Sequence, residues 1–363
     1  MTLPLTGIRI LDLTQYLPFS YGSQLLVNLG AEVVKVEPPG GELGRAMTTT
    51  FDAVSRGKRS ITLDLKDPAG ASLFLDLLPR FDVVYESFRP GTMARFGLAP
   101  DELLARSQKL VIVSATGYGQ DGPYAQRPGH DGNYLAVAGA LRPAADMPPV
   151  LPALPVADMS TGVFCALTIV AGVMSARQTG RGQHIDLAMS DVALSMNLFA
   201  VASGLSGAVG LPWPDMVTGE CPCYGTFRTG DGEWIMLGNI EPKFWQAFLN
   251  EVGLPQYRDD ALAVGERARI VKADIQAAIQ EQPAAYWDQV LGGVDVCYSP
   301  VHHITSVPDD PHMRHRGILL RQQSASTTRY PALFGAWPTA EDGPVPALGE
   351  ANSSLLEEGV REG

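Results

Sequence analysis

The chain has 363 residues, of which 45% are hydrophobic and 18% charged, an ordinary globular mixture long enough for about two domains. A formal net charge of −12 argues against a nucleic-acid surface, which needs clustered Lys and Arg, and it requires a local basic site for any anionic ligand. Four cysteines are too few for a disulfide scaffold, and no signal peptide is apparent, so we expect a cytoplasmic protein.

The first 115 residues predict alternating strands and helices. Short β-rich runs alternate with segments of helical character, and this order predicts parallel strands joined by right-handed crossovers. We therefore expect an α/β fold built on a parallel sheet. The expected strands are 8–13, 32–36, 61–65, 82–86 and 110–115, and the expected helices are 21–29, 68–78 and 100–107.

A glycine-rich segment follows the last of these strands. Residues 117–122 read Gly-Tyr-Gly-Gln-Asp-Gly, which formally matches the dinucleotide fingerprint GxGxxG. That fingerprint needs a helix N-terminus facing a pyrophosphate. Here Asp-Gly-Pro at 121–123 signals a turn, and nothing helical starts. We therefore expect a shaped loop and reject nicotinamide-linked chemistry.

The middle of the chain predicts a long helix and then a strand. Asp158 is expected as the N-cap of a helix over 159–177. Its most apolar part, 163–176, is shorter than the roughly 20 residues that span a bilayer, so we expect a buried core helix and no membrane partner. A strand is expected at 183–187.

A smaller domain is expected beyond a boundary at Pro212 and Pro214. Thr-Gly-Asp-Gly at 229–232 predicts a hairpin between strands 224–227 and 233–237, and helices are expected at 241–252 and 270–282. These elements predict a small α+β domain at 215–325. The large domain is expected to comprise 1–199 and 330–363.

Three side chains are candidates for proton chemistry. His130 can accept or donate a proton near neutral pH, although a lone loop histidine more often bonds to the backbone. Asp158 is a good N-cap and is more often structural at such a position, but a carboxylate held by helix N–H groups can act as a base or a nucleophile. Glu241 either complements a helix dipole or orients an imidazole.

Basic residues at expected strand ends are candidates for phosphate binding. Arg56, Lys58 and Arg59 precede one strand, and Arg89 and Arg95 follow another. At the carboxyl edge of a parallel sheet they would hold phosphates, and a solvated charged rim is an equally good interpretation. The pairs His302-His303 and His312-x-x-His315 have no carboxylate at metal spacing, so no metal site is expected.

At this point the chain resembles the family III CoA-transferase superfamily, and within it the α-methylacyl-CoA racemase branch. The branch is indicated by Gly-His-Asp-x-Asn-Tyr, matched at 129–134, and by Gly-x-Ile-Glu-Pro, matched at 238–242. The transferases share Asp158 but typically lack the histidine and the glutamate. The segments that resemble the whole superfamily are 5–13, 30–37, 63–66, 88–91, 117–123 and 180–183.

The resemblance implies a cofactor-independent isomerase acting on 2-methylacyl-CoA thioesters. It implies that His130, paired with Glu241, and Asp158 exchange the α-proton on opposite faces through an enolate. It also implies a Rossmann-like large domain and an interlocked homodimer, with Glu241 reaching the site from the partner subunit. The residues it places against CoA are Leu63, Ser87, Phe88, Arg89, Arg95, Gly129, Asp131, Gly132, Asn133 and Tyr134.

Two departures from the family's sequence pattern and three alternative functions stay open. Pro38 stands where relatives often place a CoA-contacting arginine, with Lys35, Arg45 and Arg59 as candidate substitutes, and Gly132 replaces a common isoleucine. The alternatives are a CoA-transferase with Asp158 as nucleophile, a CoA-thioester binding protein without turnover, and a racemase. The acyl group is open among a branched fatty chain, a sterol or bile-acid side chain and an aryl-propionyl group.

Overall fold

The structure is a computed structural model that describes residues 2–141, 148–205, 217–321, 326–336 and 343–357. It divides into two compact units, Met1–Asn197 with Arg316–Gly363, and Leu198–His315. Each unit is described by itself. The expected boundary at Pro212 and Pro214 lies outside the described residues.

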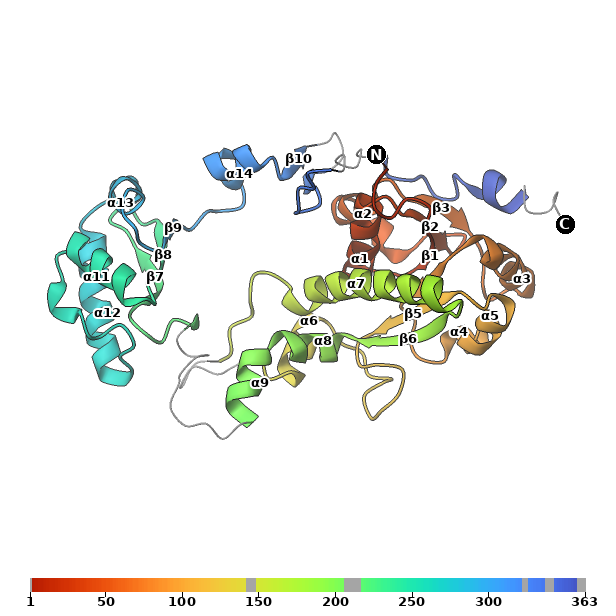
Figure 1. Cartoon of the computed structure of the whole chain (residues 1–363), viewed down its shortest axis with the longest axis horizontal. Helices are drawn as coiled ribbons and strands as arrows, with labels where there is room; N and C mark the ends of the chain where they lie inside the picture. The colour runs from red at the N-terminus through yellow and green to blue at the C-terminus, as the bar shows by residue number, and fades with distance from the viewer. Residues whose placement is uncertain (1, 142–147, 206–216, 322–325, 337–342, 358–363) are drawn as a thin grey trace. The chain divides into compact units, whose positions relative to one another are not determined.

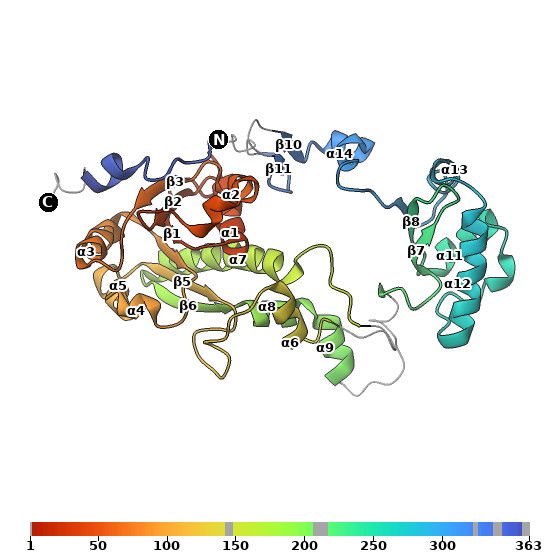
Figure 2. The same ribbon diagram turned by 180° about the vertical axis from the view of Figure 1, so that it is seen from behind.

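The first unit is built on a six-stranded parallel sheet (Figures 1 and 2). Its strand order is β3-β2-β1-β4-β5-β6, the doubly wound order. In this order the direction in which successive strands are added to the sheet reverses between β1 and β4. This confirms the predicted α/β class, with β3 two residues earlier than expected. The strands are β1 (Arg9–Leu13), β2 (Glu32–Glu37), β3 (Arg59–Thr62), β4 (Val83–Glu86), β5 (Val111–Thr116) and β6 (Gln183–Ala188).

Both faces of the sheet are buried at β1, β2, β4 and β5. Neighbouring residues such as Ile10 and Leu11, or Val33 and Val34, belong to two different hydrophobic clusters. Because successive side chains of a strand point to opposite faces, both residues of each pair are apolar. Continuous apolar runs in the sequence therefore predicted the strands well.

Helices cover the two faces of the sheet (Figures 1 and 2). One hydrophobic cluster includes residues of α1, α6, α7 and α8, and the other includes residues of α3, α4 and α5. Their bounds are α1 (Leu17–Asn28), α2 (Thr48–Ser55), α3 (Pro68–Leu77), α4 (Thr92–Arg95), α5 (Pro100–Arg106), α6 (Asp131–Val137), α7 (Val156–Thr179) and α8 (Met189–Met196), with short turns η1 (Leu43–Ala46), η2 (Leu78–Arg80) and η5 (Ser353–Glu357).

Helix α7 is longer than the sequence suggested. It has 24 residues, and by length and composition alone it is apolar enough to cross a membrane, so the argument from its shortness was wrong. Buried core helices pass the same test, and α7 packs closely on α1. A Cβ added at Gly162 would lie 2.7 Å from the carbonyl oxygen of Pro18, and one at Gly22 would lie 2.8 Å from that of Gly162.

The C-terminal segment belongs to the first unit. The Ala351 N–H donates to the carbonyl oxygen of Ser60 on β3 at 3.0 Å. The Thr327 hydroxyl donates to the carbonyl oxygen of Ala53 on α2 at 3.4 Å. Consequently the chain returns to this unit at Arg316, whereas the sequence placed the return near 330. Two short antiparallel strands lie here, β10 (Leu319–Arg321) and β11 (Ser326–Thr328).

The second unit has a three-stranded antiparallel sheet, β7-β8-β9, and its own core. The predicted hairpin is confirmed, because β7 and β8 pair on either side of residues 229–233. Helix α11 begins one residue after the expected position, whereas α12 begins five residues before it. The elements are α9 (Leu198–Leu205), β7 (Tyr224–Arg228), β8 (Trp234–Gly238), α11 (Pro242–Glu251), η3 (Pro255–Tyr257), α12 (Gly265–Gln280), α13 (Ala284–Leu291), β9 (Tyr298–Pro300), η4 (Val307–Asp309) and α14 (Pro311–Arg316).

Candidate functional site

His130 occupies the position before a helix, where the sequence suggested only a loop. Helix α6 begins at the next residue, Asp131. The Asn133 side-chain oxygen accepts the His130 N–H at 2.9 Å, and the His130 carbonyl accepts the Asn133 N–H at 2.8 Å. These reciprocal bonds close the first turn and fix the His130 backbone. Its side chain is exposed and available to a ligand.

Asp131 connects the start of α6 to the start of α7. Its carboxylate oxygen Oδ1 accepts the Asp158 N–H at 3.0 Å. Helix α7 begins at Val156, so Asp158 lies inside the first turn and Pro155 takes the N-cap position. The expected N-cap role of Asp158 is therefore wrong. Its carboxylate is half-buried and lies in the first turn of the helix.

The environment of Asp158 favours its protonated form. Burial, and then the neighbouring carboxylate of Asp131, raise the pKa of Asp158 to about 6, while His130 opposes the shift. The sequence suggested a carboxylate kept ionised by helix N–H groups. Instead, partial desolvation and a like charge dominate. A carboxyl that titrates near pH 6 can both accept and donate a proton near neutral pH.

Tyr134 holds the segment around His130 in place. Its hydroxyl donates to the Gly129 carbonyl oxygen at 2.8 Å, and its ring packs edge-on against Tyr118 at 5.2 Å. A Cβ at Gly129 would lie 3.0 Å from this ring, so glycine allows the close approach. Burial raises the pKa of Tyr134 to about 12. The phenol therefore stays protonated and serves as a donor at neutral pH.

The residues expected against CoA lie at the carboxyl end of the sheet. Arg89 and Arg95 are exposed after β4, and Arg95 Nη2 donates to the Thr92 hydroxyl at 2.7 Å. Phe88 is half-buried and packs edge-on against Phe96 at 5.9 Å. These positions suit a ligand at the strand ends.

Leu63 and Ser87 are engaged inside the unit. Leu63 follows β3, and its side chain is buried in the core, which leaves only its backbone for a ligand. Ser87 Oγ accepts the Gln15 N–H at 3.0 Å. This bond joins the loops after β1 and β4, where the strand order reverses and open α/β sheets bind ligands.

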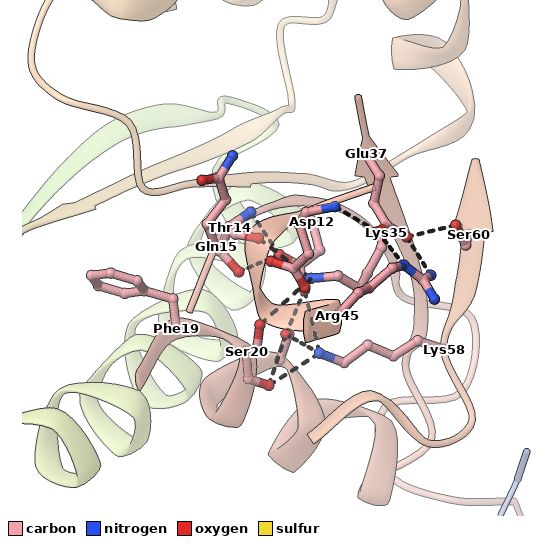
Figure 3. A network of polar contacts seen from close by, with 12 residues as sticks. Asp12, Thr14, Gln15, Phe19, Ser20, Lys35, Glu37, Arg45, Lys58 and Ser60 are labelled. Carbon is pink, nitrogen blue, oxygen red and sulfur yellow. Dashed lines mark hydrogen bonds and ion pairs between the residues drawn. The ribbon is translucent and has the colours of Figure 1, made fainter. Parts of the chain in front are cut away.

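Two members of the basic cluster at β3, Arg56 and Lys58, are buried, so neither a phosphate grip nor a solvated rim describes them. Lys58 is fully buried and donates to Ser23 Oγ at 2.8 Å and to the Ser20 carbonyl at 3.0 Å (Figure 3). Its ammonium lies 3.4 Å from the Asp12 carboxylate. Arg56 is also buried, and Arg59 pairs with Glu32 at 3.4 Å.

The three candidate substitutes for an arginine at position 38 are likewise paired inside the protein. Lys35 bonds Glu42 at 2.9 Å, Arg45 binds Glu37 through two bonds of 2.6 Å (Figure 3), and Arg59 pairs as described above. Their charges are therefore already engaged. Arg89 and Arg95 are among the exposed cations of this edge that can meet an anionic ligand.

The buried ionic network was missed in the sequence. Asp12 and Lys35 are register partners on β1 and β2, and both are essentially inaccessible. Although burial opposes it, Lys35 and Lys58 hold the pKa of Asp12 below its usual value, and burial lowers the pKa of Lys58 to about 8. The available signal was a charged residue inside each of two apolar strand runs.

Tyr16 is a second feature that sequence reasoning did not find. It precedes α1 with φ 69° and ψ 167°, a conformation favoured by glycine, and it is 49% exposed. It lies in the first turn after β1, where dinucleotide-binding folds carry glycines. This turn contains none, in keeping with the rejection of nicotinamide chemistry.

Glu241 lies in the second unit, at the N-cap of α11. Its carbonyl oxygen accepts the Trp245 N–H at 3.0 Å, and the expected position near a helix start is confirmed. His130 and Asp158 lie in the first unit. The pairing of Glu241 with His130 therefore stays a prediction.

Two findings bear on metal binding in the second unit. His302 Nε2 lies 3.1 Å from Asp310 Oδ2, a carboxylate that the sequence spacing did not suggest. Within the described ranges, no three His, Cys, Asp or Glu side chains gather as a metal site.

Comparison with known proteins identifies the family. The model of CoA-transferase family III matches residues 5–352, so the chain belongs to this family. It is 31% identical to human α-methylacyl-CoA racemase, covering 98% of this chain and 93% of that protein. It is equally similar, at 31%, to a probable fatty acyl-CoA transferase of Mycobacterium tuberculosis, covering 97% of both. A solved structure of a hypothetical M. tuberculosis protein matches with a TM-score of 0.85 and 31% identity over 98% and 99% of the two chains.

Proposed function

We propose that this chain interconverts (2R)- and (2S)-2-methylacyl-CoA thioesters by moving the α-proton from one face to the other. The observation that carries the proposal is the bond between the Asp131 carboxylate and the Asp158 N–H. It joins the two helix starts that present His130 and Asp158. Family transfer chemistry needs only the aspartate, whereas two proton-handling groups suit an isomerase.

The reaction follows from these two groups. Asp158 takes the α-proton of one enantiomer, the C–H electron pair forms a double bond between the α-carbon and the carbonyl carbon, and the carbonyl π pair moves onto the thioester oxygen. Protonated His130 then donates its proton to the opposite face, and the carbonyl re-forms. In the reverse direction the two groups exchange roles. The substrate gains and loses one proton, and no cofactor is required.

The enolate oxygen needs fixed donors. Among the described residues, the N–H groups of Asp131 and Gly132 have no acceptor, as expected at the start of a helix. We propose that they stabilise the developing negative charge. A substrate positioned there would have its α-carbon beside His130 and its CoA phosphates toward Arg89 and Arg95.

We further propose that the working form is a cytoplasmic homodimer in which the partner subunit's Glu241 orients His130. Helix α7 supports this assembly, because Val163, Leu167 and Met174 lie along it with 47%, 60% and 57% of their surface exposed. An exposed apolar stripe of this kind is typical of a surface that another chain covers. In a homodimer, the partner subunit's second unit, which carries Glu241, would be available to His130.

The second candidate is a CoA-transferase with Asp158 as nucleophile. It is favoured by the equal similarity to racemases and transferases. In that reaction the Asp158 carboxylate attacks the thioester carbonyl, the CoA thiolate leaves, and a mixed anhydride forms. An acceptor acid is then required to complete the transfer.

One experiment separates these functions. A single enantiomer of a 2-methylacyl-CoA is incubated with the protein in D2O without acceptor acid or cofactor and followed by proton NMR. Protein-dependent α-deuteration with loss of enantiomeric purity is expected. Absence of exchange with fatty, sterol-type and aryl-propionyl substrates would contradict the racemase, and a covalent Asp158 adduct by mass spectrometry would then favour transfer.

A further inference from the structure

A hollow lies between the start of α1 and the segment 42–54. Counting its open mouth, its volume is about 230 Å³. Most of its wall is apolar, and the polar side chains at its wall include Ser20 and Glu42. Apolar walls with a few polar groups are typical of small-molecule sites. The apolar lining residues are Leu17, Met47, Phe51 and Val54, with Tyr16 and Thr50 beside them.

Glu42 contributes an unused hydrogen-bond acceptor to this hollow. The residue is 6% exposed, and its Oε1 accepts from Lys35 at 2.9 Å. Its other oxygen, Oε2, is buried and has no partner in the described structure. Leaving such an oxygen unpaired costs free energy, so a donor in a ligand would gain from filling the position.

The charges around Glu42 favour a neutral donor. Three buried or partly buried carboxylates and three cations form one network, so their formal charges balance. An added ammonium would leave an excess positive charge in a poorly hydrated place, whereas a hydroxyl would not. The hollow is narrow, and its whole interior admits a group of about the size of one water molecule. The six groups are Asp12, Glu37, Glu42, Lys35, Lys58 and Arg45.

The start of α1 connects the hollow to α7, the helix that carries Asp158. Tyr16 and Leu17 form part of the wall of the hollow, and the next residue, Pro18, packs against Gly162 of α7. Gly162 follows Asp158 by four residues, so both lie on one side of α7, one turn apart. An acyl group whose α-carbon sits at Asp158 would have this hollow within its reach.

We propose that the acyl group taken by this enzyme carries a hydroxyl at its far end, and that this hydroxyl enters the hollow and donates to Glu42 Oε2. The proposal rests on the proposed function for the position of the α-carbon. Met47, 51% exposed, and Tyr16, 49% exposed, are the wall residues free to turn outward as the acyl group enters. The hydroxyl alone would fill the interior of the hollow, and the carbon skeleton, whether aliphatic or aromatic, would lie along its open mouth.

The test compares substrates that differ only in the ability of one group to donate a hydrogen bond. One pair is 6-hydroxy- and 6-fluoro-2-methylhexanoyl-CoA, and the other is 2-(4-hydroxyphenyl)- and 2-(4-fluorophenyl)propanoyl-CoA. Fluorine is close to a hydroxyl in size but cannot donate. We expect kcat/KM for α-proton exchange to favour the hydroxyl compound of at least one pair by roughly 10- to 100-fold, the range for a hydrogen bond to a charged group.

Two variants locate the preference. Gly44→Ala places a methyl group 3.6 Å from both Glu42 oxygens, which crowds Oε2 but keeps both charges of the Lys35 pair, and the backbone conformation there suits alanine. Glu42→Gln removes the charge and presents an amide. Both are expected to reduce the hydroxyl preference at least threefold while fluoro substrates keep their rates. Gly335→Ala, whose Cβ would meet open space, is the control. If the glutamine variant unfolds, the alanine variant decides.

The outcomes separate this proposal from the proposed function. Calorimetric affinities are measured for the same compounds, so binding is scored without turnover. A hydroxyl preference in binding without any exchange would contradict the racemase and still support the hydroxyl site. Equal kcat/KM and equal affinity within both pairs would overturn the proposal, as would a preference that survives in both variants.

Discussion

Asp131 is expected to set the pH range in which Asp158 works. In Asp131→Asn the amide oxygen can still accept the Asp158 N–H, while the negative charge beside Asp158 is lost. Burial is the larger cause of the raised pKa of Asp158, and Asp131 is the second. Removing the second cause should lower the pKa of Asp158 below about 6. The acid limb of racemisation should move down by the same amount.

The assay is kcat/KM for racemisation between pH 4.5 and 8, followed by chiral chromatography. The wild-type rate should fall below about pH 6, because Asp158 is then protonated and cannot act as the base. Asp76→Asn, which removes an exposed charge on α3, should leave the profile in place. An acid limb that stays fixed or moves upward in Asp131→Asn would refute this account of Asp158.

Three stability predictions rest on the buried groups. Burial raises the pKa of Glu86 to about 7, so ionising this carboxyl destabilises the folded protein. Between pH 4.5 and 7.5 the free energy of unfolding in urea should therefore fall by about 3 kcal/mol more in the wild type than in Glu86→Gln, and parallel pH curves would contradict this. Gly162→Ala forces a Cβ against the backbone of α1 and should lower the free energy of unfolding by about 1–3 kcal/mol. Gly204→Ala, whose Cβ would meet open space, should lower it by under about 1 kcal/mol, and equal melting temperatures of the two variants would contradict the packing argument. Lys58→Met should lower the free energy of unfolding by about 3–5 kcal/mol, because it leaves the buried Asp12 with one partner fewer. Adding Asp12→Asn should recover part of this loss, and a double variant whose loss equals the sum of the two single losses would contradict the coupling.

The parallel sheet was predictable because both of its faces are buried. Runs such as 83–85 and 110–113 are apolar without alternation, and each lies between helical segments, which defines a βαβ chain. The hairpin between β7 and β8 was equally clear from Thr-Gly-Asp-Gly. Local sequence carries these features, and tertiary contacts only refine their ends.

The start of α7 and the state of its carboxylate were not predictable. Asp158 has the side chain of a good N-cap, but the helix begins earlier, behind Pro155. Its pKa depends on Asp131, 27 positions earlier in the chain, and on burial by the tertiary fold. Likewise Lys58 reads as part of a surface cluster until Asp12 and the start of α1 are folded around it.

The central claim is that two groups exchange the α-proton on opposite faces of one carbon. The direct measurement is α-deuteration in D2O of each enantiomer separately by His130→Gln and by Asp158→Asn. Each variant should exchange one enantiomer without inverting it, the two variants should choose opposite enantiomers, and racemisation should fall at least about 100-fold in both. Equal loss of exchange for both enantiomers in both variants, or racemisation that persists in either, would contradict the two-group mechanism.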